Sequence, residues 1–373
     1  MTDRERQIID LLLQNPMLTQ EEIANALGIS RSSAGVHLMN LSKEGHILGR
    51  GYVLAELTEK YVVGIGAANI DLMGRSKSGL VQEDSNPGQI KMSVGGVTHN
   101  ICSNLARMGI PVKFITAVGD DMYAEKIRKD CVEAGIDTSH FLTLPHQVSS
   151  AYLSIHDRNG EMSVAISDMR VLQQLSVEFL KTKNRLLCKA SAIVMDTGLP
   201  AEILEYVSQT YGSHIPIFID PVSTTYAGKL LGSLEQYHTV KPNRQELEVL
   251  AGTPAENREE IVRASRRLLD RGVKRVVVSW GRRGSLSMDR EGPALLAKPT
   301  PIEQMANATG AGDSFMSGLV YGHLKGLSPE DTLRYATAAS RLTIQSEYTI
   351  DPFLTEQAVW EAVRAGAAEI TRI

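Results

Sequence analysis

Short apolar runs of strand character alternate with helix-like segments from about residue 60 to the end of the chain. The apolar runs lie at residues 61–66, 112–118, 192–195, 215–220 and 273–279. Segments with a helical spacing of apolar positions lie at residues 100–108, 124–134, 201–211, 244–251 and 259–271. Buried strands that alternate with helices are typical of a parallel sheet covered on both faces. The pattern therefore predicts a doubly wound α/β domain over residues 60–373.

Two segments break this alternation. Residues 72–94 are polar and interrupted by glycine and proline, whereas residues 149–166 alternate apolar and polar positions around Asn159-Gly160. An Asn-Gly pair between alternating segments is a strong hairpin signal. A hairpin inserted into a doubly wound domain would lie over one edge as a lid. We therefore expect a small β lid formed by residues 72–94 and 149–168.

The first 57 residues show a different pattern, that of three short helices. Residues 6–14 carry one broad apolar face, Thr19 and Glu22 have the spacing of a capping box, and Ser30 can cap a third helix that runs to about Glu44. Residues 45–54 then have the pattern of a short hairpin. Helix, helix, turn, helix and hairpin is the order of a winged helix-turn-helix. We predict a separate domain of this type over residues 1–57.

In such a domain the third helix would contact DNA. The candidate contacts are Arg31, Ser32, Ser33 and His37 at the start of that helix and Arg50 on the wing. The charge argues against this interpretation, because residues 1–57 contain five Lys/Arg and seven Asp/Glu, and DNA-binding modules are usually basic. A helical module for dimerisation or packing is the alternative.

Length and composition are those of an ordinary globular protein with more than one domain. The chain has 373 residues, of which 43% are hydrophobic and 22% charged, and its formal net charge is −4. A sizeable hydrophobic core is therefore available. The net charge does not indicate a polyanionic partner for the chain as a whole.

The cysteines and the absence of long apolar runs bear on the compartment. Cys102, Cys131 and Cys188 are far apart and lack the spacing of metal ligands, which favours buried thiols in a reducing environment. The chain has no pattern of a signal peptide and no run long enough to cross a bilayer. We expect a cytoplasmic protein with no membrane partner.

The strongest candidate for chemistry is the glycine-rich stretch at residues 308–315, which leads into a helix-like run through His323. Gly310, Ala311 and Gly312 have little or no side chain, so a ligand can approach their backbone N–H groups, and a helix N-terminus favours negative charge. Asp313 follows directly and could accept a proton from an alcohol while the amides hold a phosphoryl group. The alternative is a tight loop in which Asp313 only caps the helix.

Two further groups of residues follow the first predicted strand and precede the first predicted helix. Asn69 and Asp71 could hold vicinal hydroxyls, or could form an Asx turn. Gly95 and Gly96 let a ligand touch the backbone, and Asn100 can donate to a hydroxyl. His99 lies between them, and a lone histidine here is more often a loop or packing residue than a base.

Two more groups lie at the ends of later strands. Asn243 and Glu246 are three residues apart at the start of a helix, where they could serve a Mg²⁺ ion held mainly through water and phosphates, or could only cap that helix. The turn that contains Ser279, Gly281 and Gly284 could approach nucleotide phosphates, or could be a plain turn. Ligands bind at the carboxyl ends of strands in open α/β sheets, so these groups are expected to converge.

Several common catalytic motifs are absent from the sequence. There is no GxxxxGK[ST] loop, which excludes a P-loop nucleotide hydrolase, and no HExxH, GxSxG or GxGxxG stretch.

From about Tyr61 to the end, these motifs together resemble the ribokinase-like (PfkB) family of carbohydrate and nucleoside kinases. The resemblance implies a phosphotransferase with an alcohol group as acceptor, ATP and Mg²⁺ as cofactors, and Asp313 as the catalytic base with Gly310, Ala311 and Gly312 as the anion hole. It places Asn243 and Glu246 at the Mg²⁺ and phosphates. It assigns sugar binding to Asn69, Asp71, Gly95, Gly96, Asn100 and Asp168, and nucleotide binding to Ser279, Gly281, Gly284 and Thr309.

Within that family the chain is most similar to pseudouridine kinases. The features that carry this likeness are the Gly-Gly-Val-x-x-Asn signature, the Ile-Ser-Asp-Met stretch that ends the lid hairpin at Asp168, and the Asn-x-Thr-Gly-Ala-Gly-Asp stretch. The chain departs from those kinases at Thr98 and His99, where they have a small residue and an arginine. Asn307 stands where many relatives have an aspartate that helps to bind potassium, so K⁺ stays an open candidate.

The resemblance implies transfer of a phosphoryl group from MgATP to the 5′-hydroxyl of pseudouridine, with a homodimer as the expected assembly. A kinase acting on another nucleoside or sugar is one alternative. A ligand-sensing transcriptional regulator built on a kinase fold is a second, and an enzyme whose sugar site reports to DNA is a third. The intact Gly-Ala-Gly-Asp stretch favours an enzyme, because a sensor needs no base.

Overall fold

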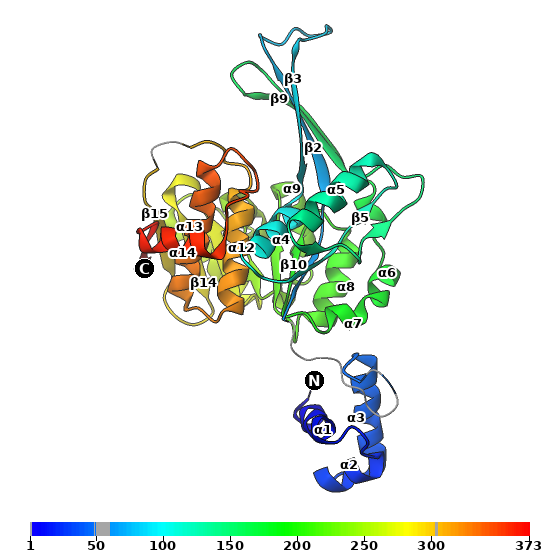
Figure 1. The fold of residues 1–373 in the computed structure, drawn as a ribbon. Coiled ribbons are helices and arrows are strands. Elements are labelled where there is room, and N and C mark those ends of the chain that lie inside the picture. The colour runs from blue at the N-terminus through cyan, green and yellow to red at the C-terminus, as the bar shows by residue number, and fades with distance from the viewer. Residues whose placement is uncertain (1, 48, 50–59, 303–304) are drawn as a thin grey trace. The chain divides into compact units, whose positions relative to one another are not determined.

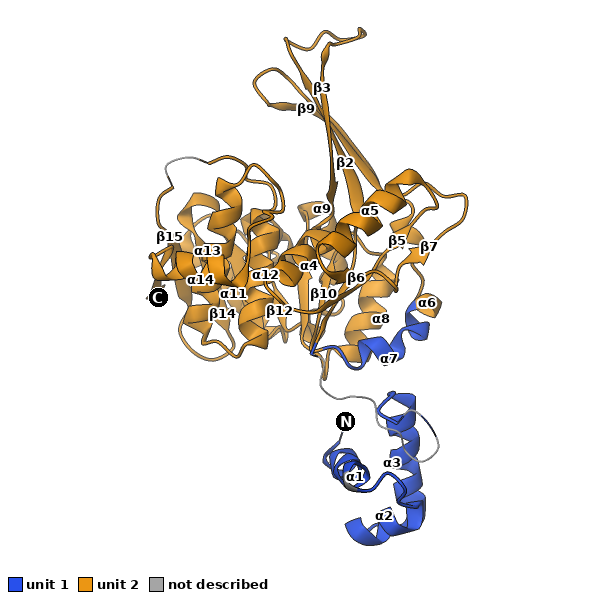
Figure 2. Cartoon of the chain, in the orientation of Figure 1, with its two compact units in different colours: residues 1–60, 180–190 blue, residues 61–179, 191–373 orange. Residues whose placement is uncertain are grey.

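The computed structural model describes residues 2–47, 49, 60–302 and 305–373. The chain divides into two compact units (Figure 2). Residues 1–60 and 180–190 form the first, and residues 61–179 and 191–373 form the second. Each unit has its own hydrophobic core.

The first unit is built on the helices α1 (Asp3–Gln14), α2 (Gln20–Leu27) and α3 (Arg31–Lys43), with the short α7 (Asn184–Leu187) in its second segment. Capping boxes at Thr2 and Thr19 begin α1 and α2, and the Ser30 hydroxyl caps α3. Its core is apolar and fully buried and consists mainly of Ile8, Leu12, Ile23, Ala34, Leu38 and Leu41. The three predicted helices are therefore confirmed. The predicted wing hairpin, with Arg50, falls mostly on residues 48 and 50–59, which lie outside the described residues.

The second unit contains a ten-stranded sheet with the order β16-β15-β14-β13-β12-β11-β10-β1-β4-β6. The strands are β1 (Val62–Ile65), β4 (Val112–Ile115), β6 (Ile136–Asp137), β10 (Ala192–Asp196), β11 (Ile217–Asp220), β12 (Thr239–Val240), β13 (Arg275–Ser279), β14 (Ser285–Asp289), β15 (Leu295–Pro299) and β16 (Ala368–Arg372). Neighbours from β6 to β13 pair in parallel, and β13 to β16 pair antiparallel. The predicted parallel sheet has in addition an antiparallel edge, because the turn at residues 280–284 is too short for a crossover and folds β14 back on β13.

Helices cover the sheet. They are α4 (Val97–Arg107), α5 (Met122–Glu133), α6 (Val177–Thr182), α8 (Ala201–Tyr211), α9 (Thr224–Ala227), α10 (Arg244–Ala251), α11 (Arg258–Asp270), α12 (Ala311–Leu324), α13 (Pro329–Gln345) and α14 (Glu356–Arg364). The central strands β1, β10 and β11 are buried at every position, as expected for strands covered on both faces. Several predicted bounds were wrong. Helix α4 begins at Val97 and not at residue 100, and the predicted strand 112–118 is split between β4 and β5 (Ala117–Val118), which pairs with β7 (Leu142–Thr143) in a separate sheet.

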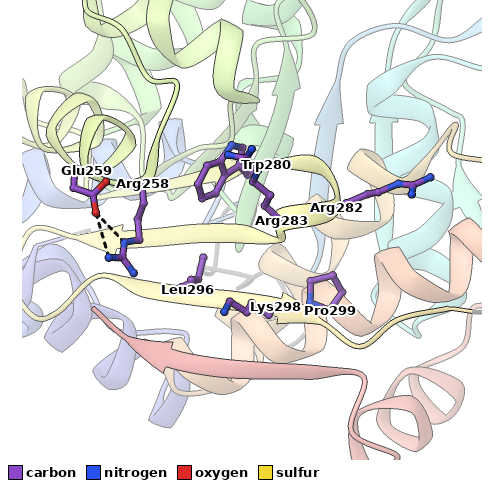
Figure 3. Close-up of a pocket in the computed structure, with 8 residues that line it drawn as sticks. All are labelled: Arg258, Glu259, Trp280, Arg282, Arg283, Leu296, Lys298 and Pro299. Atoms are coloured by element: carbon purple, nitrogen blue, oxygen red, sulfur yellow. Dashed lines mark hydrogen bonds and ion pairs between the residues drawn. The ribbon is translucent and has the colours of Figure 1, made fainter.

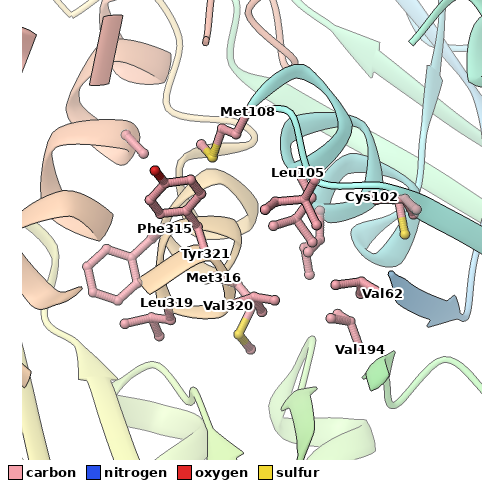
Figure 4. Packing of buried hydrophobic residues seen from close by; sticks show 14 of the residues in the cluster. Val62, Cys102, Leu105, Met108, Val194, Phe315, Met316, Leu319, Val320 and Tyr321 are labelled. Carbon is pink, nitrogen blue, oxygen red and sulfur yellow. The ribbon is translucent and has the colours of Figure 1, made fainter. Parts of the chain in front are cut away.

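One hydrophobic cluster fixes the helix that carries the candidate anion loop (Figure 4). Met316 and Val320 of α12 and Leu105 of α4 share this cluster with Val62 and Val194 of the central strands, and all five are buried. The start of α12 is thereby held at the end of the central strands. Glycine allows α13 to pack closely on α12, since a Cβ at position 318 would fall on the backbone of α13.

A second, four-stranded sheet projects from the body of the second unit (Figure 1). Its order is β3-β2-β8-β9, formed by β2 (Asn69–Ser76), β3 (Gly88–Gly95), β8 (Ala151–His156) and β9 (Met162–Asp168). Its strands lie where the lid was expected, and the turn between β8 and β9 contains the predicted Asn159-Gly160 pair. We call this sheet the lid. Among the helices that the structure describes, none has the length and apolar character needed to span a membrane.

Candidate active site

Part of the predicted site lies where the strand order of the main sheet reverses, between β1 and β10. From β1 the chain proceeds outward to β4 and β6 on one side, and from β10 it proceeds through β11 and β12 to β13 on the other. The carboxyl ends of the parallel strands at such a reversal are left uncovered by the crossovers and form a ligand crevice. The N-terminus of α12 contributes Asp313, which is hydrogen-bonded to Asn100 and is influenced by the charge of Lys241.

Asp313 is not a helix cap. The N-cap of α12 is Gly310, which has a φ of +82°, and Asp313 is the third residue of the helix. A Cβ at Gly310 would collide with the carbonyl oxygen of Thr349, so only glycine fits this turn. The backbone N–H of Thr309 donates to Asn307 Oδ1 at 2.9 Å and closes the approach to the turn. The first-turn amides of α12 have no partner within the helix, and Asp313 lies in the same turn.

The carboxyl group of Asp313 is bound by a residue from another helix. Asn100 Nδ2 donates to Asp313 Oδ2 at 2.7 Å. Burial raises the pKa of Asp313 to about 7, and the carboxylates of Asp220 and Asp196 add to this rise, while the Asn100 hydrogen bond and Lys241 oppose it. A carboxyl group with a pKa near 7 can accept and release a proton near neutral pH, which suits a general base.

A second polar group lies at the base of the lid. Asn69 Nδ2 donates to Asp71 Oδ1 at 2.6 Å, and the register of β2 and β3 places Gly95 opposite Asn69. A Cβ at Gly95 would collide with the Asp71 carboxylate, and Gly96 has a φ of +107°. Burial raises the pKa of Asp71, although the Asn69 hydrogen bond and the charge of His99 lower it. The structure therefore brings these four predicted residues together.

Asp168 is not part of that group. It lies in the same cross-strand row as Ile70 and Ala151, whereas Asp71 lies in the next row, and adjacent rows point to opposite faces of a sheet. Its carboxylate accepts two hydrogen bonds from the Arg170 guanidinium, at 2.7 and 2.9 Å. These bonds hold the pKa of Asp168 below its usual range.

Asp196 is a buried carboxylate that the sequence reasoning missed. At the end of β10 it accepts hydrogen bonds from the backbone N–H groups of Ala67 at 3.0 Å, Thr98 at 3.3 Å and Gly198 at 2.8 Å, and from the Thr98 hydroxyl at 2.5 Å. The Gly96 N-cap has no side chain, so Asp196 satisfies a first-turn amide of α4 in its place. It therefore fixes the glycine loop that precedes Asn100. Burial raises its pKa.

A buried ion pair also influences Asp313. Lys241 Nζ is 2.9 Å from Asp220 Oδ2, and both side chains are almost fully buried. A methyl group at Gly312 would lie 3.5 Å from Lys241 Nζ, so the ammonium adjoins the start of α12. Burial favours the neutral form of the lysine, but the Asp220 carboxylate outweighs it and raises the pKa of Lys241. The cation is well placed to meet negative charge in the crevice.

The sequence contains a signal for Asp196 and Asp220, the two carboxylates that the motifs did not single out. Asp196 and Asp220 directly end the apolar runs of β10 and β11, which is the same position after a strand that drew attention to Asn69 and Asp71.

Asn243 and Glu246 form a complete capping box at the start of α10. Asn243 Oδ1 accepts from the Glu246 N–H at 2.9 Å, and the Glu246 carboxylate accepts from the Asn243 N–H at 2.8 Å and from its Nδ2 at 2.7 Å. Capping, the alternative raised from the sequence, is thus present. It does not exclude a ligand role, because Glu246 is buried next to Lys241 and Asp220, and burial raises its pKa.

These residues supply two oxygen donors to the crevice, one carboxylate and one amide. Within the part of the chain that the structure describes, no cluster of three or more His, Cys, Asp or Glu side chains could hold a metal ion. The donor set fits a Mg²⁺ ion that keeps several waters and is bound chiefly by the phosphates of a nucleotide.

The turn after β13 borders a cavity of about 510 Å³ (Figure 3). Ser279 is paired with Asn243 through a bridge between their backbones, and Gly281 and Gly284 have φ values of +57° and +103°. The cavity is lined by Trp280, Arg282 and Arg283 of this turn with Arg258, Glu259, Leu296, Lys298 and Pro299. The Arg283 guanidinium lies 4.9 Å from the centre of the Trp280 ring. An aromatic ring among cationic side chains is suited to a nucleotide.

In the first unit, Arg31 and Ser32 are exposed in the first turn of α3, and Ser33 is half-buried. His37 lies 3.5 Å from Glu5 on α1 and is directed toward that helix. Arg31 and Ser32 are thus open to solvent, whereas the His37 ring contacts Glu5.

Comparisons with known proteins agree with this geometry. The model of the family described as pfkB family carbohydrate kinase matches residues 59–356, and that of a winged helix-turn-helix DNA-binding family matches residues 1–47. The uncharacterized sugar kinase YeiI of Escherichia coli is 36% identical over 355 residues, which cover 95% of this chain and 97% of that protein. The pseudouridine kinase of Escherichia coli is 36% identical over 295 residues, which cover 79% of this chain and 94% of the relative.

Solved structures show the same fold. A protein named as a sugar kinase, from Clostridium perfringens, superposes with a TM-score of 0.77 at 32% identity, over 85% of this chain and 99% of the other. Arabidopsis thaliana ribokinase, complexed with ribose and ATP, gives a TM-score of 0.74 at 21% identity, over 82% of this chain and 99% of the other. At that identity the second likeness concerns the fold.

The Lys241–Asp220 pair generates a prediction about stability. Lys241→Met leaves a buried carboxylate without its cation, and we expect the free energy of unfolding at pH 7 to fall by about 3–5 kcal/mol. The double variant Lys241→Met/Asp220→Asn should recover most of that loss. Urea unfolding measures both. The control is Arg258→Met, which removes an exposed ion pair with Glu259 and should cost less than about 1 kcal/mol. A single variant as stable as this control would contradict the account of the pair.

Proposed function

The chain belongs to the pfkB family of carbohydrate kinases, phosphotransferases that act on an alcohol group, and we propose that it transfers a phosphoryl group from ATP to the 5′-hydroxyl of pseudouridine. The observation that carries the reaction type is the Asp313 carboxyl beside the first-turn amides of α12, with a pKa near 7. The substrate rests on the likeness to the pseudouridine kinase of Escherichia coli, which extends over 94% of that protein. A kinase of another nucleoside or sugar is the alternative within the same chemistry.

The ribosyl part of the acceptor would bind between the lid and the main sheet. Asn69, Asp71 and Asn100 present amide and carboxylate groups that suit vicinal hydroxyls. Gly95 and Gly96 leave the backbone open to a ring. The resemblance also assigned Asp168 to this site. Because its carboxylate is paired with Arg170, Asp168 would contact the substrate only after that ion pair breaks.

In the reaction, Asp313 takes the proton of the 5′-hydroxyl while the oxygen of that hydroxyl attacks the γ-phosphorus of ATP. A new bond forms between the 5′-oxygen and phosphorus, the bond from phosphorus to the bridging oxygen breaks, and ADP leaves. The amides of Gly310, Ala311 and Gly312 and the ammonium of Lys241 would stabilise the negative charge on the transferring group. Positioning and electrostatics supply the acceleration, with no covalent enzyme intermediate.

ATP would lie along the edge formed by Ser279, Gly281, Gly284 and Thr309, with its base toward the Trp280 cavity. Asn243 and Glu246 would hold Mg²⁺ through water and phosphate, and the ion would neutralise phosphate charge when bound. Asn307 caps the turn before α12, so we propose that K⁺, if it binds, is not held by a carboxylate there.

We propose that the lid also forms the interface of a homodimer. The register of its strands puts a continuous apolar set on one face, made of Leu72, Ile90, Met92, Leu153, Val164 and Ile166. All but Leu72 are well exposed. An apolar face of this size on a projecting sheet is typical of a protein interface.

The dimer proposal predicts a change in mass. Ile90 is 79% exposed, and Ile90→Lys places a charge in the apolar face, so sedimentation velocity should show this variant as a monomer where the wild type is a dimer. Lys91→Glu changes the charge of the next residue on the polar face and serves as control. A wild-type monomer, or a dimeric Ile90→Lys, would refute the interface.

The mechanism predicts the pH dependence of turnover with pseudouridine. The base must be ionised, so kcat/KM should be constant above a pH of about 7 and fall as the pH drops through about 7. Asp313→Asn should lower kcat about 10²- to 10⁴-fold with little change in the KM for ATP. Asp270→Asn, an exposed carboxylate at the end of α11, is the control. An active Asp313→Asn enzyme would sink the assigned role.

We further propose that the first unit binds DNA through α3. The family match and the exposed Arg31 and Ser32 favour this. Affinity for duplex fragments should fall steeply as salt rises from 50 to 200 mM, and Arg31→Ala should weaken binding about tenfold, while Arg6→Ala on α1 should not. Electrophoretic mobility shifts measure this. No binding at low salt would leave the unit as a helical packing module.

A further inference from the structure

His99 is fully buried in the first turn of α4, directly before Asn100. The sequence favoured a loop or packing role for it. Its ring does pack near Phe114, with 6.4 Å between the ring centres. The two ring nitrogens also contact polar groups, and one of these is the amide that binds Asp313.

The contacts of the His99 ring indicate which of its two nitrogens carry a hydrogen. Nε2 lies 3.2 Å from Asp130 Oδ2 on α5 and 3.5 Å from the Ser103 hydroxyl, and Nδ1 lies 3.2 Å from Asn100 Oδ1. A carboxylate and an amide oxygen can only accept hydrogen bonds. With Asp130 Oδ2 at Nε2 and Asn100 Oδ1 at Nδ1, hydrogen bonding at both nitrogens requires the doubly protonated ring, the imidazolium.

The charge of the ring is consistent with its surroundings. Burial alone would lower the pKa of His99, but hydrogen bonds with Asp130 and Cys131 outweigh it and raise that pKa to about 10. Burial raises the pKa of Asp71 on the lid, and the charge of His99 opposes that rise. The ring thus stays charged over the pH range in which Asp313 titrates.

The charged His99 ring sets the orientation of the Asn100 amide. An asparagine amide can turn over and exchange its oxygen and nitrogen at little cost unless its partners distinguish them. His99 donates to Oδ1, which leaves Nδ2 to face Asp313 at 2.7 Å. In the reverse orientation the amide oxygen would face the carboxylate of Asp313, and both groups would be acceptors.

We propose that His99 is a positioning residue of the phosphoryl transfer: held by Asp130, it fixes the Asn100 amide so that Nδ2 donates to the catalytic base Asp313. This inference rests on the proposed function of Asp313. The relay runs Asp130, His99, Asn100, Asp313, with successive distances of 3.2, 3.2 and 2.7 Å. It connects a carboxylate that is 39% exposed on α5 with the crevice.

Two variants of similar size separate this role from packing. In His99→Asn the amide nitrogen replaces Nδ1 and can still donate to Asn100. In His99→Gln the longer amide replaces Nε2, reaches toward Asp130 and loses the link to Asn100. The hydrogen bond from Asn100 lowers the pKa of Asp313, so its loss raises that pKa, and less of the base is ionised at a given pH. The other charges near Asp313, on Asp220, Asp196 and Lys241, are the same in both variants.

We expect His99→Gln to lower kcat roughly ten- to a hundredfold and to move the acidic limb of the pH–kcat/KM profile to higher pH. His99→Asn should keep that limb close to the wild-type position. Asp130→Asn should give a weaker form of the His99→Gln effect, and Glu125→Gln, elsewhere on α5, should give none. All of these kinetic assays use the acceptor that the wild-type enzyme phosphorylates fastest.

A direct titration of the Asp313 carboxyl complements the kinetics. Carbon NMR of aspartate-labelled protein, with the resonance assigned by its absence in Asp313→Asn, reports that titration without turnover. A midpoint that rises in His99→Gln and not in His99→Asn supports the relay. Equal midpoints in both variants and the wild type, or equal losses of kcat in both variants with unshifted midpoints, overturn it. If the wild type phosphorylates no acceptor, the proposed function fails, and the midpoints still decide on the relay.

Discussion

The burial of carboxylates at one edge of the main sheet is the constraint on which the rest of the site depends. Asp196, Asp220 and Asp313 converge there, and Lys241 is the ammonium that the structure places against them. Each carboxylate is stabilised differently. Asp196 accepts hydrogen bonds from backbone N–H groups, Asp220 pairs with Lys241, and Asp313 has the hydrogen bond from Asn100 and the charge of Lys241. Burial raises the pKa of Asp313 to about 7, which suits this carboxylate to exchange a proton near neutral pH.

This arrangement follows from packing far from the chemistry. The apolar face of α12 is set against α4 and the central strands, so the first turn of α12 cannot move independently of the glycine loop that begins α4. Asp196 ties that loop to β10, and His99 ties α4 to α5. Four elements distant in sequence thus fix one carboxyl group. Pre-organisation of this kind is what a transfer without covalent chemistry requires.

Much of the fold could be predicted because apolar runs and caps are local signals. The capping boxes at Thr19 and Asn243 and the hairpin at Asn159-Gly160 are present as expected. The antiparallel edge could not be read, since β14 to β16 lack a distinctive pattern and depend on pairing with β13. In the site, Asn100 contacts Asp313 and Asn69 contacts Asp71. The place of Asp168 depends on strand register, and the role of His99 depends on its contact with α5. Spacing along the chain reveals neither.

The most direct test of the central claim is the identity of the product formed from ATP. Purified chain with Mg²⁺ is offered pseudouridine, uridine, ribose and fructose, and phosphorus NMR records where the phosphoryl group goes. The account predicts a phosphomonoester coupled to the 5′-methylene protons of pseudouridine, formed at least tenfold faster than any product from uridine. A different preferred acceptor would keep the mechanism and reject the substrate. ATP left intact with every acceptor would contradict the account of this site as a kinase.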